Sequence, residues 1–156
     1  MKKSLRVILI GCVESSKEAL LALQKIDKAC CNLVGVMTKK KSVFNSDFVD
    51  LSPLVTEESI SVLYYDDSEL TTIDWLRKLE PDLVFCIGWS HLLEAEAFNI
   101  PSIATLGYHP AALPENRGRH PIVWALALGL QKTASTFFRI TEGADEGPIA
   151  SQVAVP

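Results

Sequence analysis

The stretch from Gly107 to Pro121, GYHPAALPENRGRHP, concentrates residues that can transfer protons and bind anions. It contains two histidines, two arginines and three prolines, a composition that a folded core does not require. His109 follows an apolar run that predicts a buried strand, and an imidazole at such a strand end can act as a general acid or base near neutral pH. The alternative is a histidine that only hydrogen-bonds to the loop backbone. Position and residue type alone favour neither role.

A second loop, Thr141 to Ile149, reads TEGADEGPI and carries three carboxylates and two glycines. Glycines at 143 and 147 would let the backbone approach a ligand closely. Asp145 lies between them and could orient or charge a neighbouring imidazole. The alternative is an aspartate in a solvated turn, the commoner role for this residue type in loops. We expect this loop to lie beside the one that carries His109.

The elements that must position these loops alternate along the chain. Apolar runs predict strands, and amphipathic stretches predict helices, the first of them capped at Ser15–Ser16. The predicted strands are 5–11, 33–38, 60–65, 82–88, 104–108, 135–140 and 149–155, and the predicted helices are 17–26, 70–79 and 121–130. Strands that are apolar throughout indicate a sheet covered on both faces. We therefore expect one α/β domain over residues 1–156, doubly wound around a mostly parallel, Rossmann-like sheet, with ligands beyond the carboxyl ends of the strands.

Three further features of the sequence concern the ligand and the extent of the domain. The junction after Gly11 lacks the second and third glycines of a dinucleotide fingerprint, which disfavours a nicotinamide dehydrogenase. The run Lys39–Lys41 could attract an anion, although a short lysine run is more often solvated surface. The chain also stops within a predicted strand, so we expect a missing C-terminal segment.

Composition disfavours nucleic acid and a membrane as partners, although it does not exclude a tRNA substrate. A formal net charge of −4 provides no basic face for nucleic acid, and the apolar start at 5–10 is too short for a signal sequence or a membrane span. The cysteines lie in or beside apolar runs with a spacing that suits neither a metal site nor a disulfide framework. We expect buried, reduced thiols in a cytoplasmic protein without a metal. The cysteines are Cys12, Cys30, Cys31 and Cys86.

The two loops together resemble a known enzyme family. Its signature is Asn-x-His, then Leu-Pro-x-x-(Arg/Lys)-Gly, then Asp-x-Gly about three dozen residues beyond the histidine. This chain has Gly107-x-His109, then Leu113-Pro114-Glu-Asn-Arg117-Gly118, then Asp145-x-Gly147. The pattern resembles that of the 10-formyltetrahydrofolate-dependent formyltransferases, which include methionyl-tRNA, glycinamide ribonucleotide and nucleotide-sugar enzymes. The order of elements agrees along nearly the whole chain, although outside the motifs the likeness is one of pattern only.

The resemblance implies a reaction and a set of site residues. His109 corresponds to the family's catalytic general acid/base, and Asp145 to the carboxylate that assists it. The formyl donor would be 10-formyltetrahydrofolate, and the group would pass to a primary amine without a metal or a covalent enzyme intermediate. The positions that correspond to the folate-binding residues are His91, Leu92, Leu93, Arg119, Thr141, Glu142, Gly143, Ala144 and Asp145. Leu92 and Leu93 could instead be core residues, and Arg119 a surface cation.

Gly107 departs from the family pattern, because an asparagine that stabilises the oxyanion of the tetrahedral intermediate stands there in the family. An oxyanion donor contributes several kcal/mol to the transition state, so its loss needs compensation or implies weak activity. We expect the small residue to leave space beside His109 for another donor. His120, Asn116 and a backbone N–H are the candidates.

The amine acceptor is harder to infer. Arg117–Pro121 resembles the corresponding segment of formyltransferases that act on amino sugars attached to nucleotides, whereas Asp145–Ile149 with Gln152 resembles glycinamide ribonucleotide formyltransferase and formyltetrahydrofolate hydrolase. We favour a small amine, an amino sugar on a nucleotide carrier, whose negative charge would suit Arg117 and the lysine run. The alternatives are a hydrolase, a glycinamide ribonucleotide or methionyl-tRNA formyltransferase, and a non-catalytic folate- or nucleotide-binding domain.

Overall fold

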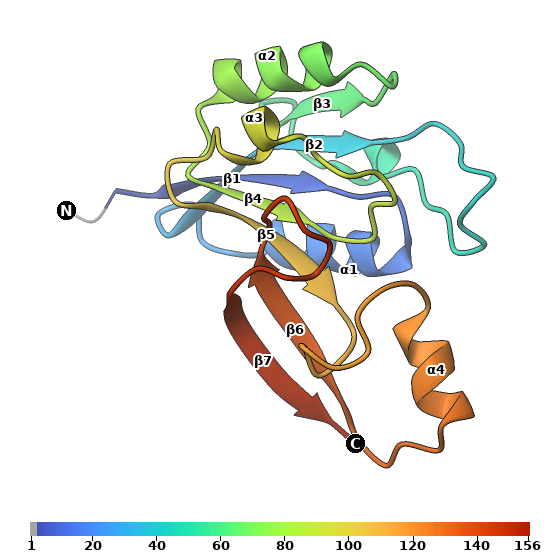
Figure 1. The fold of residues 1–156 in the computed structure, drawn as a ribbon. Helices are drawn as coiled ribbons and strands as arrows, with labels where there is room; N and C mark the ends of the chain where they lie inside the picture. Colours follow the sequence, from blue (N-terminus) through green and yellow to red (C-terminus); the bar gives the residue numbers. More distant parts are fainter. Residues whose placement is uncertain (1–2) are drawn as a thin grey trace. The chain divides into compact units, whose positions relative to one another are not determined.

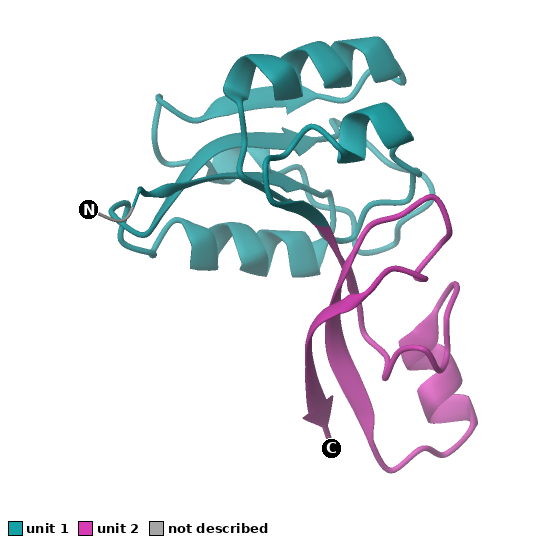
Figure 2. Cartoon of the chain, turned by 60° about the vertical axis from the view of Figure 1, so that its left-hand side comes forward, with its two compact units in different colours: residues 1–105 teal, residues 106–156 magenta. Residues whose placement is uncertain are grey.

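The computed structural model describes residues 3–156 (Figure 1). The chain forms two compact units, Met1–Thr105 and Leu106–Pro156, which Figure 2 shows in different colours. Unit 1 is an α/β layer structure. Unit 2 is built of antiparallel strands and one short helix.

Unit 1 is organised around a parallel sheet with the strand order β3-β2-β1-β4. Its strands are β1 (Leu5–Ile10), β2 (Cys31–Thr38), β3 (Ser61–Tyr64) and β4 (Leu83–Cys86). β1 pairs in parallel with both β2 and β4, and β2 pairs in parallel with β3. The stretch Val7–Ile10 is almost inaccessible to solvent, as expected for a central strand with helices on both faces.

Helices cover both faces of this sheet (Figure 1). Helix α1 (Glu14–Leu23) lies on one face, and α2 (Glu69–Leu79) and α3 (Ala95–Phe98) lie on the other. The short 3-10 helix η1 (Ser52–Leu54) contacts α1. The predicted doubly wound, mostly parallel arrangement is confirmed in this unit. Within residues 3–156, no helix combines the length and the apolar character needed to cross a membrane.

The start of α1 differs from the prediction. The helix begins at Glu14, with the extended residue Val13 as its N-cap, instead of at Lys17 after a serine cap. Ser16 is fully buried, and its hydroxyl donates a hydrogen bond to the Ile87 carbonyl and accepts one from the Val13 N–H. Ser16, which the sequence suggested as a cap, therefore lies inside the first turn of α1. Its hydroxyl links the helix to the segment after β4. Four-residue α3 went unpredicted because one turn carries no helical periodicity.

Unit 2 consists of three antiparallel strands and a helix. The strands are β5 (Ala104–His109), whose first two residues belong to unit 1, β6 (Thr133–Arg139) and β7 (Ile149–Val155), and the helix is α4 (Pro121–Ala127). β6 pairs antiparallel with β5 and with β7. The parallel character expected from apolar strands therefore stops at β5. Burial in β6 alternates along the strand, the pattern of an antiparallel sheet with one solvated face. Helix α4 ends before the predicted residue 130, because Gly129 takes a left-handed conformation with φ of 63°.

The cysteines are all free, but their burial only partly follows the prediction, and Cys30 contradicts it. Cys12 is buried and Cys31 and Cys86 are partly buried, whereas Cys30 is exposed. Cys30 lies in the turn before β2, where its N–H donates to the Asp27 carbonyl. Apolar neighbours in the sequence do not show whether Cys30 lies in this turn or in the buried strand that follows it.

Candidate active site

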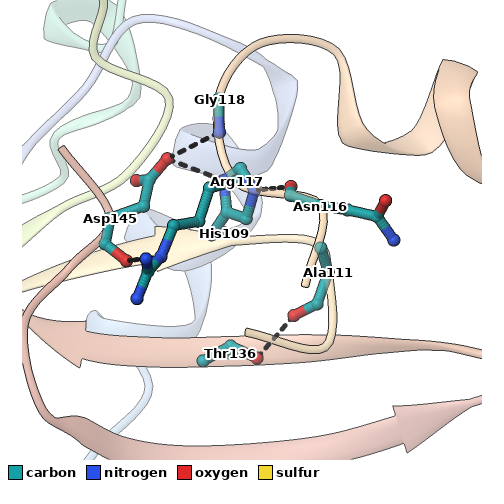
Figure 3. Close-up of polar contacts among 7 residues, drawn as sticks. All are labelled: His109, Ala111, Asn116, Arg117, Gly118, Thr136 and Asp145. Atoms are coloured by element: carbon teal, nitrogen blue, oxygen red, sulfur yellow. Dashed lines mark hydrogen bonds and ion pairs between the residues drawn. The ribbon is translucent and has the colours of Figure 1, made fainter. Parts of the chain in front are cut away.

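His109, at the end of β5, is buried with 6% of its surface exposed and has both ring nitrogens directed at loops (Figure 3). Its Nε2 lies 2.8 Å from the backbone carbonyl oxygen of Asn116. A carbonyl can only accept, so Nε2 must carry a proton and donate it. Nδ1 faces Asp145, with 3.7 Å between Nδ1 and Oδ2. This spacing leaves Nδ1 free to exchange a proton next to a carboxylate.

Asp145 is held by the loop that follows β5. Its Oδ2 accepts a hydrogen bond from the Gly118 N–H at 3.2 Å, and its backbone carbonyl accepts one from Arg117 Nε at 3.2 Å. The residue itself is in the left-handed region, with φ of 55°. The two loops therefore lie side by side, as expected from their sequences, and the short distance between His109 and Asp145 is a property of unit 2 alone.

A glycine at position 147 is required by this arrangement. A Cβ added to Gly147 would lie 1.6 Å from the Arg139 carbonyl oxygen at the end of β6. The Arg139 N–H also donates to the Pro148 carbonyl at 2.8 Å, so the chain returns onto β6 directly after Asp145. The close approach is between two parts of the backbone.

Gly107 is not beside an open space. It pairs with Phe138 across β5 and β6, and a Cβ added to Gly107 would lie 2.6 Å from Phe138 Cζ. Phe138 is buried, so its ring fills the volume that the glycine leaves. The expectation that a second donor enters this space is therefore wrong, because an apolar ring already occupies it.

The two predicted replacement donors have different settings. The side-chain amide of Asn116 points away from His109 in Figure 3, and the residue instead offers its backbone carbonyl to the imidazole. His120 is exposed and precedes α4 with φ of 57°. Neither side chain is directed at His109 by a hydrogen bond within residues 3–156. Their role as donors remains a prediction, and a backbone N–H remains the third candidate.

The remaining predicted folate residues of unit 2 are accessible. Arg119, Thr141, Glu142 and Ala144 are exposed, and Gly143 is partly exposed. A ligand in solution can therefore reach this loop, although accessibility alone does not distinguish a binding residue from a surface residue.

The predicted folate residues of unit 1 follow β4 and have three different environments. Leu92 is 79% exposed, whereas Leu93 belongs to the hydrophobic core of the unit. His91 contacts Lys39 Nζ through Nε2 and packs against the rings of Tyr65 and Trp89, with centroid distances of 5.1 and 5.7 Å. Burial, and then the neighbouring Lys39 charge, lower the pKa of His91. The environment of Leu93 matches the alternative that this residue belongs to the core and does not bind folate.

Lys39 is not simply solvated. Its Nζ lies 5.2 Å from the centroid of the Trp89 ring and 5.8 Å from that of Tyr65, while Lys40 Nζ lies 4.9 Å from the Tyr64 ring. Lys39 and Lys40 thus lie over aromatic side chains at the end of β3 and after β3 and β4.

Two further residues connect to the His109 loop, Thr136, which the sequence did not single out, and Gln152, which it singled out only as part of a family resemblance. Thr136, on β6, is fully buried, and its Oγ1 donates to the Ala111 carbonyl at 2.6 Å (Figure 3). Gln152, on β7, donates through Nε2 to Thr136 Oγ1 at 2.9 Å and to the Leu113 carbonyl at 3.1 Å. A threonine and a glutamine in strands carry no sequence signal of this kind, because the contacts depend on strand register.

Curated relatives of this chain are formyltransferases and a bifunctional protein. A methionyl-tRNA formyltransferase of Thermotoga sp. (strain RQ2) is 28% identical over 153 residues, covering 95% of this chain and 48% of that protein. The bifunctional polymyxin resistance protein ArnA of Wigglesworthia glossinidia brevipalpis is 34% identical over 88 residues, covering 56% of this chain and 14% of that protein. The chain thus spans about half the length, or less, of these relatives.

Solved structures have the same fold. The crystal structure of phosphoribosylglycinamide formyltransferase from Brucella melitensis matches with a TM-score of 0.76 and 27% sequence identity, covering 99% of this chain and 81% of that one. The model of the formyl transferase family matches residues 5–156, which include all three sequence motifs. The chain therefore belongs to the formyl transferase family.

Proposed function

We propose that this protein transfers a formyl group from 10-formyltetrahydrofolate to a primary amine, with His109 as the general acid/base and Asp145 as its partner. The observation that carries the proposal is the arrangement of His109, whose Nε2 is anchored on the Asn116 carbonyl while Nδ1 faces the Asp145 carboxylate. Membership of the formyl transferase family supports both the reaction class and the folate donor.

The chemistry requires one proton to leave the amine and one to reach the donor. The amine nitrogen attacks the formyl carbon, a C–N bond forms and negative charge develops on the formyl oxygen. The amine proton passes to His109 Nδ1, where Asp145 Oδ2, 3.7 Å away, stabilises the resulting cation. Collapse of the intermediate breaks the bond to N10 of the folate, and N10 takes up the proton. With Nε2 fixed on a carbonyl, a single nitrogen of His109 serves both transfers.

We infer that the amine belongs to an amino sugar on a nucleotide carrier. Arg117 is exposed, and only its Nε takes part in the hydrogen bond to Asp145 that holds it in place. The rest of the guanidinium fork is suited to a phosphate group. The net charge of −4 disfavours a polyanionic tRNA, which the name of the Thermotoga relative would otherwise suggest.

The test is a deformylation assay on the full natural chain. Purified protein is mixed with 10-formyltetrahydrofolate, and tetrahydrofolate release and product mass are followed with nucleotide-linked amino sugars, glycinamide ribonucleotide, methionyl-tRNA or no amine. We expect a formylated amino sugar, and His109→Ala should abolish its formation. Release without an amine would indicate a hydrolase. Binding of the folate without any release would indicate a non-catalytic domain and contradict the proposal.

A further inference from the structure

One row of residues crosses the three strands of unit 2 and ends at His109. Thr136 lies opposite His109 in the β5–β6 pairing and opposite Gln152 in the β6–β7 pairing. The row therefore connects the imidazole through a buried hydroxyl to an amide on β7. Because both pairings are set by strand register, the three side chains are fixed relative to one another.

Two hydrogen bonds of this row end on the loop after β5. Thr136 Oγ1 donates to the Ala111 carbonyl at 2.6 Å, and Gln152 Nε2 donates to the Leu113 carbonyl at 3.1 Å. Gln152 also donates to Thr136 Oγ1 at 2.9 Å, so the single hydroxyl proton of Thr136 is left for Ala111. Both backbone carbonyls thus accept a hydrogen bond from a strand side chain of unit 2.

The loop held in this way provides the anchor of the imidazole. Three residues after Leu113, the Asn116 carbonyl accepts the hydrogen bond from His109 Nε2 at 2.8 Å. The Gly118 N–H then binds Asp145 Oδ2. A shift of this loop would displace both the carbonyl that fixes Nε2 and the amide that fixes the carboxylate.

The polar groups of Thr136 and Gln152 indicate a role in holding the loop. Thr136 is fully buried between strands, where a valine of the same shape would avoid the burial of a hydroxyl. Gln152 belongs to β7, every residue of which is exposed, so its amide could have remained in water. Instead, the amide donates to the Leu113 carbonyl of the site loop and to the Thr136 hydroxyl on β6.

We propose that Gln152 and Thr136 are positioning residues that hold the 111–116 segment so that His109 keeps Nε2 on the Asn116 carbonyl and Nδ1 toward Asp145. The catalytic consequence rests on the proposed function of His109. The structural consequence, a fixed tautomer of the imidazole, does not rest on it.

The experiment compares four variants of the full chain. Gln152→Leu removes both donors at nearly constant volume on an exposed strand, and Thr136→Val removes the buried hydroxyl. Thr136→Ser keeps that hydroxyl. Gln131→Leu is the matched control, because Gln131 is an exposed glutamine of unit 2 whose amide, among residues 3–156, donates to the Gly129 carbonyl of its own turn. Each variant is examined by ¹⁵N NMR of the His109 ring without substrate, and by kcat and KM for formyl transfer.

We expect Gln152→Leu and Thr136→Val to weaken or abolish the His109 Nε2–H signal and to lower kcat by about tenfold or more, with KM changed by less than about threefold. Thr136→Ser and Gln131→Leu should resemble the wild type in both measurements. If Thr136→Val does not fold, Gln152→Leu alone decides, since it leaves the core unchanged.

An unchanged His109 signal in Gln152→Leu would overturn the proposal, whatever the activity. A kcat that falls only in proportion to the folded fraction, with the tautomer kept, would show a purely structural role. A lost Nε2–H signal in a protein that never transfers formyl groups would support the positioning role and contradict the proposed function instead.

Discussion

The electrostatic and structural roles of Asp145 can be tested separately. Its carboxylate faces His109 Nδ1 and also accepts a hydrogen bond from the Gly118 N–H. Asp145→Asn keeps an oxygen that can accept from the Gly118 N–H but removes the charge that faces His109 Nδ1. We expect kcat to fall by about a hundredfold or more while KM for the folate changes little. The measurement is steady-state kinetics beside thermal unfolding. A parallel loss of thermal stability and activity would instead favour a structural role for this carboxylate.

The cysteines differ in reactivity for a physical reason. Burial raises the pKa of Cys86 to about 12 and also raises the pKa of Cys12, so both remain thiols at pH 8, whereas Cys30 is exposed. The thiolate is the form that reacts with alkylating reagents. Iodoacetamide at pH 8 should therefore modify Cys30 first and leave Cys12 and Cys86 intact until the protein is unfolded. Peptide mass spectrometry over time measures this order, and equal rates at all three positions would contradict it.

At the scale of the elements, the contact between β5 and β6 at Gly107 and Phe138 predicts coupled substitutions. Gly107→Asn restores the family's residue, but its Cβ would meet the buried Phe138 ring. Overpacking of this kind costs about 1–3 kcal/mol of unfolding free energy. We expect Phe138→Ala to be destabilising alone and the double variant to be less destabilised than the sum of the two. Urea unfolding of the four proteins of this cycle measures the coupling, and strict additivity would refute the contact.

The junction of β1 and β4 depends on Asp82. Its Oδ2 accepts from the Arg6 N–H at 2.9 Å and its Oδ1 from the Ser102 hydroxyl at 2.7 Å. These hydrogen bonds, the Arg6 one first, lower the pKa of Asp82 in the folded protein. A lowered carboxyl pKa stabilises the fold above the unfolded pKa, and this contribution is lost as the pH falls through the folded pKa.

Asp82→Ala should therefore lower the Tm at pH 7. The difference in Tm from the wild type should shrink as the pH falls from about 4, near the ordinary pKa of an aspartate, through the lowered pKa of Asp82, because protonation removes the charge that the variant lacks. Calorimetry across this pH range makes the measurement. A difference in Tm that stays constant down to pH 2 would show that the carboxylate charge is not involved.

The elements also show which predictions the sequence could support. Alternating apolar and amphipathic segments predicted β1 to β4 and α2 closely, because each segment is long enough to show its period. The boundaries of α1 and α4 were missed, since a buried serine and a glycine in the left-handed region decided them. The antiparallel direction of β6 and β7 depends on pairing partners, which a single-sequence pattern does not contain.

At the scale of the whole molecule, the motifs were enough to bring His109 and Asp145 together, but not to describe their support. The Asn116 carbonyl, the Phe138 ring and the amide of Gln152 act through contacts set by register and loop conformation. A pattern of residue types says nothing about which backbone atom a side chain will meet. The acceptor amine is similarly beyond the motifs, because they describe the formyl transfer and not the molecule that receives the group.

The left-handed backbone of Asp145 limits how this position can change over evolution. With φ of 55°, it favours glycine, asparagine and aspartate over all longer side chains. Only one of these three carries a charge. A glutamate, which would extend the carboxylate by one methylene, must also overcome the backbone preference. Substitutions tolerated by the backbone at position 145 therefore tend to remove the negative charge. A homologue that needs the charge has almost no substitute for aspartate there.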